Sequence, residues 1–384
     1  MTKPLLVDLF SGCGGFGLGG ELAGFHSAIA VDVDPTLQSS YKLNFPNTKV
    51  MIGDIAAMNA AGWKLLLSGL EVDGVIGGPP CQGYSRQGVA DPNDARRTLL
   101  HEFFKSVNAI SPKFFIMENV EGLLDKKNLP ELSSAISELH PSYHVLEPMV
   151  LDASNYGLPT KRKRVFVVGY KTNYVDPIHI EDFMKFKDKV DVRGAINDVP
   201  NPISQGTKNL DFAWAKYDGR KKRSEYADLM KVLPVEGLGS DLAIKKLREG
   251  YVSGNYHTKH TESVSSRYES IEPGKTDPVS RSKRLEWDGF CPTLRAGTGS
   301  DKGSYQAVRP LHPDIGRVIT VREAARLQSF PDWFLFHHTK WHSFRMIGNS
   351  VPPLLSKMIL GVLREKCSSV SDSSLAETYS AMEV

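Results

Sequence analysis

The sequence predicts an α/β protein with a doubly wound, mostly parallel sheet and a smaller, irregular second domain. In the first 170 residues, short apolar runs that end in glycine or an acidic residue alternate with stretches of helical periodicity. This is the pattern of a parallel sheet with crossover helices. Between residues 171 and 303 the apolar runs shorten, and Lys, Asp, Asn, Ser and Gly dominate. Helical patterns return after residue 320, which marks the end of the second domain.

The expected strands are short apolar runs of the kind that lies buried in a parallel sheet. The first run ends at Phe10, before a cluster of glycines, and the second is closed by Asp32. Together the expected strands cover residues 5–10, 27–31, 74–76, 114–117 and 165–168.

Helical stretches separate or follow these strands. The glycine-rich segment after the first strand can carry a short helix, and the segment from Thr320 to Glu323 has the pattern of a capping box that opens an amphipathic helix. The expected helices cover residues 17–24, 99–110, 129–139, 320–329 and 351–363. The serine-rich segment 367–384 is expected to be disordered.

The composition is that of an ordinary globular protein: of 384 residues, 41% are hydrophobic and 24% are charged. No apolar run approaches the roughly 18 residues of a membrane span, and no secretion signal opens the chain. We therefore expect a cytoplasmic protein without a membrane partner. The 4 cysteines are scattered and form no C-x-x-C pair, so neither a disulfide framework nor a metal site is indicated.

The net charge of +3 hides an uneven distribution. Acidic residues outnumber basic ones in residues 1–150, whereas Lys and Arg are in excess in residues 151–300, which contain the run Arg220, Lys221, Lys222 and Arg223. A basic middle segment fits contact with a polyanion such as nucleic acid. A solvated, lysine-rich surface explains the same charge equally well.

The segment from Gly12 to Gly17 matches G-x-G-x-x-G directly after a strand, and Asp32 follows the next strand. In such a fingerprint the glycines let a ligand approach the backbone, and the carboxylate receives ribose hydroxyls. The pattern predicts a nucleoside-type cofactor and does not separate a nicotinamide dinucleotide from S-adenosylmethionine. The alternative is that the glycines only form a tight turn.

Two more acidic residues are expected at strand ends, where open α/β sheets bind ligands. Asp54 would follow the third strand and could accept a hydrogen bond from an adenine amino group, although a lone aspartate there is often a turn or cap residue. Glu118 ends the strand 114–117, and glutamate is rarely buried without a task or a partner.

Cys81 lies in the most specific motif, Pro79-Pro80-Cys81-Gln82, directly after Gly78. The two prolines fix the backbone ahead of the cysteine, and nearby glycines leave room for a planar ligand to approach its sulfur. This tetrapeptide should arise by chance in only about two of a thousand chains of this length. A buried core cysteine is the alternative interpretation.

Arg162 and Arg164 lead into the strand 165–168 and share one face by strand alternation. Such a pair could hold a carbonyl oxygen or a phosphate. Basic residues that flank a strand are also commonly just solvated.

In chain order these motifs resemble the signature of the DNA (cytosine-5)-methyltransferase family of bacterial restriction-modification systems. The resemblance spans residues 5 to about 170 and 284 to 363. It rests on residues 8–15, the Pro-Pro-Cys-Gln segment, residues 118–120, the two arginines, residues 322–331 and residues 348–352. Asp32 and Val33 stand where the family often has glutamate and a larger residue, Thr160 replaces its usual glutamine, and Met346 precedes Ile347-Gly348-Asn349.

The resemblance implies a Rossmann-like domain that binds S-adenosylmethionine and releases S-adenosylhomocysteine, facing a target-recognition domain across double-stranded DNA. The implied contacts of the methyl donor are Phe10, Gly12, Gly14, Asp32, Val33, Asp54, Ile55, Pro79, Leu99, Asn349 and Val351. The implied contacts of the target cytosine are Cys81, Glu118, Arg162 and Arg164. Gln82 and Ser85 would contact the DNA, as would the basic run from Arg220 to Arg223.

On the same resemblance, residues 1–170 would form the catalytic and cofactor-binding domain and residues 171–320 the target-recognition domain. Residues 321–343 would be a hinge, and residues 344–366 would be C-terminal helices that complete the catalytic domain. The protein would act as a monomer, with a separately acting restriction endonuclease as a possible partner.

The chemistry explains why these side chains are needed. Carbon 5 of cytosine is a poor nucleophile, so a thiolate, here that of Cys81, must first add at carbon 6. Glu118 could then donate a proton to nitrogen 3, and Arg164, helped by Arg162, could bind oxygen 2. The cytosine must leave the base stack to reach these groups.

Three alternatives remain at this point. A cytosine-5 methyltransferase acting on tRNA would use the same chemistry. A nicotinamide-dependent oxidoreductase would explain the glycine fingerprint and Asp32 but would leave Cys81 and the arginines idle. A catalytically silent DNA-binding relative is disfavoured because Cys81, Glu118 and both arginines are present.

Overall fold

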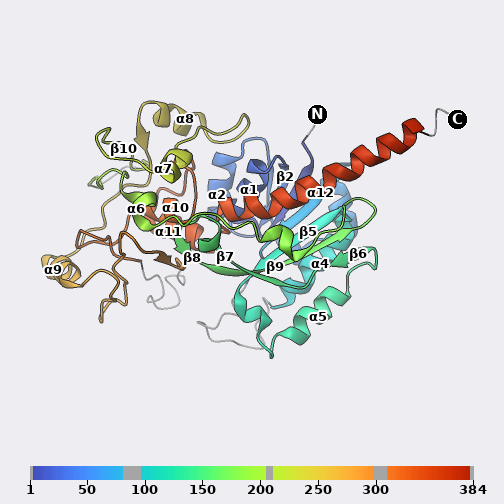
Figure 1. The fold of residues 1–384 in the computed structure, drawn as a ribbon, viewed down its shortest axis with the longest axis horizontal. Helices are drawn as coiled ribbons and strands as arrows, with labels where there is room; N and C mark the ends of the chain where they lie inside the picture. Colours follow the sequence, from blue (N-terminus) through green and yellow to red (C-terminus); the bar gives the residue numbers. More distant parts are fainter. Residues whose placement is uncertain (1–2, 81–96, 205–210, 297–308, 381–384) are drawn as a thin grey trace.

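A central sheet forms the framework of the first half of the chain (Figure 1). The computed structural model describes residues 3–80, 97–204, 211–296 and 309–380, and side chains as far as Cys367. The strands of this sheet are β1 (Leu5–Leu9), β2 (His26–Asp32), β3 (Lys49–Ile52), β4 (Gly74–Gly77), β5 (Phe114–Asn119), β6 (Tyr143–Val145), β7 (Met149–Asp152) and β9 (Lys163–Lys171).

The strand order is β3-β2-β1-β4-β5-β9-β6, and β7 pairs with the other end of β9. The pairs from β3 to β5 are parallel, whereas β9 runs antiparallel to β5, β6 and β7. The prediction of a mostly parallel α/β sheet is therefore confirmed. The order reverses between β1 and β4, and in open α/β sheets such a switch point opens a crevice at the carboxyl ends of the strands.

Helices cover both faces of the sheet because successive strand residues point to opposite sides. On one face, Leu6, Ile76 and Ile116 pack with α1 (Gly15–Leu22) and α12 (Pro353–Ser380). On the other face, Val7 and Val75 belong to a cluster that includes residues of α3 (Ala60–Leu67), α4 (Thr98–Ile110) and α5 (Leu129–Ser137). Figure 1 shows α12 crossing the sheet beside α1.

The N-terminal and C-terminal helices approach each other closely where α1 crosses α12. A Cβ atom at Gly19 would lie 1.6 Å from the Ser356 hydroxyl oxygen, so this crossing excludes any larger residue. Residues near the C-terminal end of the chain thus pack directly on the helix that follows the first strand.

The part of the chain between β9 and residue 320 is irregular, with short helices and two-residue strands. Its elements are α6 (Val192–Ile196), β10 (Ala215–Lys216), α7 (Glu225–Met230), α8 (Asp241–Arg248), β11 (Tyr251–Val252), α9 (Glu262–Ser270) and β12 (Cys291–Pro292). Single 3-10 turns also occur throughout, namely η1 (Ile55–Ala57), η3 (Glu121–Leu124), η4 (Ala153–Asn155) and η5 (Ile180–Phe183). β12 pairs in parallel with β8 (Thr160–Lys161), so this region attaches beside β9.

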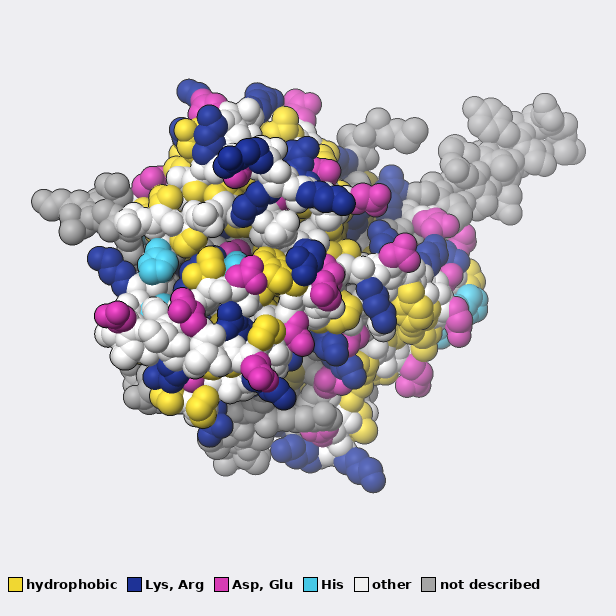
Figure 2. Space-filling view, turned by 60° about the vertical axis from the view of Figure 1, so that its left-hand side comes forward, with side chains coloured by type: hydrophobic (Ala, Val, Ile, Leu, Met, Phe, Trp, Pro, Cys, Tyr) yellow, Lys and Arg dark blue, Asp and Glu magenta, His cyan; other side chains and the backbone are white. Residues whose placement is uncertain are grey.

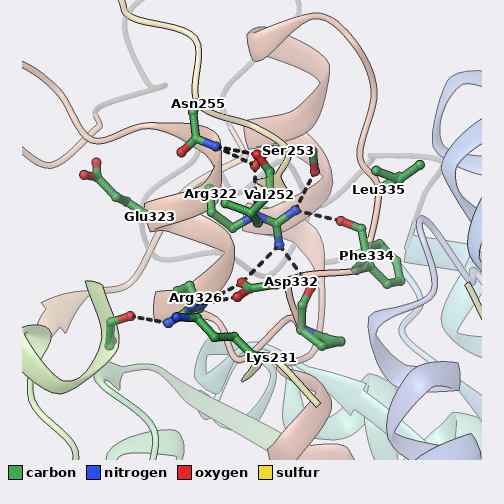
Figure 3. Close-up of polar contacts among 12 residues, drawn as sticks. Lys231, Val252, Ser253, Asn255, Arg322, Glu323, Arg326, Asp332, Phe334 and Leu335 are labelled. Atoms are coloured by element: carbon green, nitrogen blue, oxygen red, sulfur yellow. Dashed lines mark hydrogen bonds and ion pairs between the residues drawn. The ribbon is translucent and has the colours of Figure 1, made fainter. Parts of the chain in front are cut away.

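A buried ionic cluster joins α10 (Val321–Leu327) to the irregular region (Figure 3). Nε and Nη2 of Arg326 each lie 2.6 Å from one carboxylate oxygen of Asp332, and Nη1 lies 3.2 Å from Asp198. Arg322 donates to the backbone and hydroxyl oxygens of Ser253, at 3.0 and 2.7 Å. Because both arginines are fully buried, their charges depend on these partners.

Some helices were not expected from the sequence. They include α2 (Pro35–Asn44), α3, the short helices α6 to α9, and the first turn of α11 (Lys340–Asn349), whose later residues fall within the C-terminal helices expected over 344–366. α11 lies within and beyond the expected hinge 321–343, and its Phe344, Met346 and Ile347 are buried in the same cluster as residues of α10 and α2. α12 continues to Ser380, into the segment 367–384 for which the sequence analysis expects disorder.

Among the described residues, one helical stretch, Lys340–Cys367, is long and apolar enough to cross a membrane. Of its most apolar window, 72% is buried inside the protein. A core helix of a globular domain has the same properties, so this finding is weak support for a membrane span.

Candidate active site

A cavity of about 650 Å³ lies at the carboxyl ends of the parallel strands, where the strand order reverses. Its walls come from the segments that follow β1, β2, β3 and β4, from the end of β5, and from α4, α11 and the residues between α11 and α12. Its size is in the range of cofactor and small-ligand sites. Of the residues predicted to contact the methyl donor, all except Gly14 line this cavity. They are Phe10, Gly12, Asp32, Val33, Asp54, Ile55, Pro79, Leu99, Asn349 and Val351.

The glycine-rich turn after β1 has an unusual backbone. Phe10 and Gly12 have φ angles of 53° and 56°, in the left-handed region. A Cβ atom at Gly12 would meet nothing within 4 Å, so its backbone faces open space. Gly14 has φ 98°, and a Cβ there would lie 2.4 Å from the Phe45 ring. Gly14 is therefore required by packing and by the start of α1, and does not line the cavity.

The Asp32 carboxylate is held by backbone groups at the end of β2. Oδ2 accepts a hydrogen bond from the Gly12 amide at 2.9 Å, and Oδ1 accepts one from the Asp34 amide at 2.8 Å. Burial raises the pKa of Asp32 above its usual value, although these two amides act against the shift. The side chain of Val33, 68% exposed, follows it at the rim of the cavity.

Asp54 performs the capping role that the sequence analysis left open, and it also lines the cavity. Its Oδ1 accepts a hydrogen bond from the Ala56 amide at 2.9 Å and so caps η1. On the opposite side, the C-terminal end of α11 is held close to the chain at Ala296. A Cβ atom at Gly348 would lie 2.6 Å from the Ala296 nitrogen, so only glycine allows Asn349 to stand where it does.

Glu118 and Arg164 form an ion pair at the end of the cavity nearest to β5 and β9. Arg164 Nε lies 2.8 Å from Glu118 Oε1, and both side chains are largely buried. A Cβ atom at Gly78 would lie 3.1 Å from Glu118 Oε2, so the carboxylate sits between the arginine and the segment that leads to Cys81. Glu118 of β5 pairs with Phe166 of the antiparallel strand β9. Arg164 lies two residues before Phe166 in β9 and is therefore close to the carboxyl end of β5.

Arg162 also lines the cavity, but its guanidinium binds backbone carbonyls. Nη1 donates to Gly348 at 3.0 Å and lies 3.4 Å from the carbonyl of Leu294. The side chain is 1% exposed. The two arginines therefore differ in environment, although strand alternation places them on one face.

One residue with a positioning role escaped the sequence analysis. Asn119 Nδ2 donates to the carbonyl of Pro79 at 3.2 Å, and its Oδ1 accepts from the Val120 amide at 2.9 Å. Asn119 thereby fixes the Pro-Pro segment against the end of β5. Its place in the Glu-Asn-Val motif, residues 118–120, was the available signal.

Three predicted site residues, Cys81, Gln82 and Ser85, lie outside the residues that the structure describes.

The basic run from Arg220 to Arg223 lies between β10 and α7 and does not line the cavity. Arg220 pairs with Asp218, and Arg223 pairs with Asp228, each at 3.0 Å. These ion pairs make the surface around the run mixed in charge. Elsewhere too, basic and acidic side chains alternate on the surface, as the upper part of the molecule in Figure 2 shows.

Asp8 forms part of the cavity floor and is fully buried. Its Oδ2 accepts a hydrogen bond from the Tyr41 hydroxyl at 3.2 Å. Burial raises the pKa of Asp8 to about 8, and the negative charge of Asp32 acts in the same direction. The carboxyl group is thus mostly protonated at neutral pH.

Because folding raises the pKa of Asp8, the protein should lose stability as the pH rises from about 4 to about 8. The unfolded chain ionises near 3.8, whereas the folded protein keeps its proton until about 8. The cost reaches at most about 5 kcal/mol at pH 8, at about 1.4 kcal/mol for each tenfold change in the ionisation constant. We expect Asp8→Asn to remove this component. Urea unfolding of both proteins at pH 5 and pH 8 measures it, and parallel pH profiles would contradict the prediction.

The fold and the cavity define an open α/β protein with a ligand site at the switch point of its sheet. Comparison with known proteins then gives the family. The family model of C-5 cytosine-specific DNA methylases matches residues 5–365. The chain therefore belongs to the C-5 cytosine-specific DNA methylase family and is a DNA (cytosine-5)-methyltransferase, which sets aside the nicotinamide-dependent alternative.

Individual relatives agree with this assignment. The type II methyltransferase M.XorII of Xanthomonas oryzae pv. oryzae is 39% identical, over 94% of this chain and 84% of its own. The type II methyltransferase M.DdeI of Desulfomicrobium norvegicum is 31% identical, over 92% and 87%. Among solved structures, a protein described as a DNA modification methyltransferase encoded within an Escherichia coli prophage has a TM-score of 0.85 at 38% identity, over 95% of this chain and all of its own. The S. pombe Dnmt2 methyltransferase, at 17% identity and TM-score 0.58, shares the fold.

Proposed function

We propose that this protein transfers a methyl group from S-adenosylmethionine to carbon 5 of a cytosine that has left the stack of double-stranded DNA, within a specific recognition sequence. The observation that carries the proposal is the Glu118–Arg164 pair. It stands beside the segment that leads to Cys81 and at the end of a cavity suited to a nucleoside-type donor. The proposed reaction uses both parts of this arrangement: the Glu118–Arg164 pair acts on the cytosine, and the cavity holds the methyl donor.

The residues present fit S-adenosylmethionine. The Gly12 backbone faces open space, Asp32 offers a carboxylate at the end of β2, and Val33 offers an apolar surface at the rim. Asp54 and Ile55 come from the end of β3, and Asn349 and Val351 close the cavity from the C-terminal side. The donor supplies an electrophilic methyl group on a sulfonium, and the residues named here bind and orient it.

The remaining side chains act on the cytosine. The Cys81 thiolate adds to carbon 6, and electrons move toward carbon 5 as nitrogen 3 takes a proton from Glu118. Arg164, held by its ion pair with Glu118, hydrogen-bonds oxygen 2 and offsets the charge that develops there. Carbon 5 then takes the methyl group. Water removes the proton from carbon 5, and the bond between sulfur and carbon 6 breaks with its electron pair returning to the Cys81 thiolate. Nitrogen 3 then gives its proton back to Glu118.

Arg162 and Asn119 position this machinery. Arg162 connects the strand that carries Arg164 to the carbonyl of Gly348, next to Asn349 on the donor side. Asn119 connects Glu118's strand to Pro79, next to the segment of Cys81. Both side chains therefore act by donating to a backbone carbonyl, Arg162 to that of Gly348 and Asn119 to that of Pro79.

In this proposal residues 1–170 and 344–366 form the catalytic part, and residues 171–320 recognise the DNA target, with Gln82, Ser85 and the run from Arg220 to Arg223 as DNA contacts. Residues 321–343 connect the two as a hinge. The protein acts as a monomer in the bacterial cytoplasm, alongside a restriction endonuclease that works separately. The support is that M.XorII and M.DdeI are named type II methyltransferases.

Methylation of plasmid DNA with S-adenosylmethionine labelled in the methyl group tests the proposal. We expect label in the DNA, and base-resolution mapping should place 5-methylcytosine at one position of one short sequence. A parallel reaction with bulk tRNA should stay unlabelled, and label in tRNA alone would favour the RNA methyltransferase instead. The matched control is Glu118→Gln, which should lower the rate at the same sites without changing their sequence. Label in neither substrate would overturn the proposal.

A further inference from the structure

Arg345 is a basic group on the wall of the donor cavity that the chemistry above does not use. It lies in α11, and its Nη1 is 2.6 Å from Asp34 Oδ2. The side chains are 29% and 20% exposed, so the pair is accessible from the cavity but partly shielded from water. In the part of the chain that the structure describes, Asp34 is the only group that meets this guanidinium at ion-pair distance.

The Asp34 carboxylate is held in place by backbone amides, and its ion pair in turn holds the Arg345 guanidinium in place. Its Oδ1 caps α2 by accepting hydrogen bonds from the amides of Thr36 and Leu37, at 2.8 and 3.3 Å. Although burial alone would raise the pKa of Asp34, Arg345 and these two amides hold it below its usual value. A carboxylate held on one side by a helix N-terminus and on the other by a guanidinium has little freedom to move.

The arrangement supplies hydrogen-bond donors on the side of the cavity where Asp32 and Asp34 offer carboxylate acceptors. Asp32, two residues before Asp34, presents carboxylate oxygens that already receive the amides of Gly12 and Asp34. A nucleoside carries hydroxyl groups that can donate to such a carboxylate, and it also carries unprotonated ring nitrogens of the base and a sugar ring oxygen that can only accept. A guanidinium has five N–H donors and no acceptor, and the contact with Asp34 leaves several of them available.

We propose that Arg345 is a donor-binding residue, whose guanidinium hydrogen-bonds acceptor atoms of the nucleoside of S-adenosylmethionine, and that Asp34 is the residue that positions it. This rests on the proposed function, because it takes S-adenosylmethionine as the ligand. It adds a contact from the middle of α11 to a site that already includes Asn349 at the end of that helix. It also connects donor binding to α11, whose Phe344 and Ile347 pack with α10.

Calorimetric titration with S-adenosylhomocysteine, without DNA, tests this inference on the full chain. Arg345→Gln should weaken binding about tenfold, Arg345→Lys about threefold, and Asp34→Asn between these values, because each removes one or two charge-assisted hydrogen bonds. The melting temperature of the unliganded variants should stay within about 2 °C of the parent protein. In turnover, KM for S-adenosylmethionine should rise while kcat and KM for DNA stay close to their original values.

Lys113→Gln is the matched control, because it breaks the 2.6 Å pair with Asp73 near the start of β4 without touching the cavity. It should leave the affinity for S-adenosylhomocysteine unchanged. If Arg345→Gln binds as tightly as the parent protein, or if its weaker binding is matched by an equal loss of DNA affinity and a fall in melting temperature, Arg345 only ties α11 to α2. If the parent protein itself does not bind S-adenosylhomocysteine, the donor in the proposed function is wrong, and this inference falls with it.

Discussion

Replacement of Cys81 by serine is expected to abolish methyl transfer while leaving the affinity for S-adenosylhomocysteine nearly unchanged. Serine is a much weaker nucleophile at neutral pH, so the rate should fall on the order of 10⁴-fold or more. Glu118, Arg164 and the donor cavity would remain, since Asn119 holds the preceding Pro79 independently of the thiol. Single-turnover methylation of the mapped target sequence, together with calorimetric titration of S-adenosylhomocysteine, measures both effects.

A covalent test separates the nucleophile from other losses of activity. DNA with 5-fluorocytosine at the target position cannot lose its carbon 5 substituent as a proton, so the adduct with the enzyme should persist after methyl transfer. The unaltered protein should form a cross-link that survives denaturing electrophoresis, and Cys81→Ser should not. Cys291→Ser replaces a buried cysteine of β12, the strand that pairs with β8, and this variant should still form the cross-link. A cross-link to Cys81→Ser would remove Cys81 from the reaction.

Breaking the buried ionic cluster of Figure 3 should produce a large loss of stability. Arg326→Met would leave Asp332 without its closest counter-charge, whereas Asp198 would keep its ion pair with Lys231. Arg326 and Asp332 are no more than 1% exposed, so water cannot replace the lost partner. Removing one partner of a buried pair typically costs 3–5 kcal/mol, here on the order of 4 kcal/mol. Urea unfolding monitored by tryptophan fluorescence gives the free energy.

Two comparisons make that result interpretable. Arg193→Gln breaks an exposed pair with Asp288, so it should change the free energy of unfolding by less than about 1 kcal/mol. Arg326→Met combined with Asp332→Leu removes both buried charges, and it should recover part of the loss because no unpaired carboxylate then remains at position 332. A double variant no more stable than Arg326→Met alone would mean that size and packing, rather than charge, decide the cost.

The strand ends and the residues on them could be predicted from local patterns. The apolar runs of β1, β2 and β5 end at Phe10, Asp32 and Glu118. Because the carboxyl ends of parallel strands lie at one edge of the sheet, these three residues are expected there from local sequence alone. Residues of this kind line the cavity together. The expected helices over 99–110 and 129–139 likewise correspond to α4 and α5, because their apolar residues repeat with helical spacing.

Local patterns failed where a residue's partner comes from a distant part of the chain. Strand alternation places Arg162 beside Arg164, yet Arg162 turns to the carbonyl of Gly348, which lies 186 residues further on. Gly14 fits the fingerprint, but Phe45 of the chain after α2 occupies the space beside it. Neither contact leaves a periodic trace in the sequence.

The amino-acid order alone therefore determined the sheet, the edge on which the cavity-lining groups gather, and the motif that contains the proposed nucleophile, Cys81, because each depends on spacing within a few residues. Only the tertiary structure decided which arginine pairs with Glu118 and that Arg345 of α11 lines the cavity. It also decided how Arg326 connects α10 to the irregular region. Those choices depend on how segments far apart pack against one another. Burial and charge pairing are properties of that packing and not of any single segment.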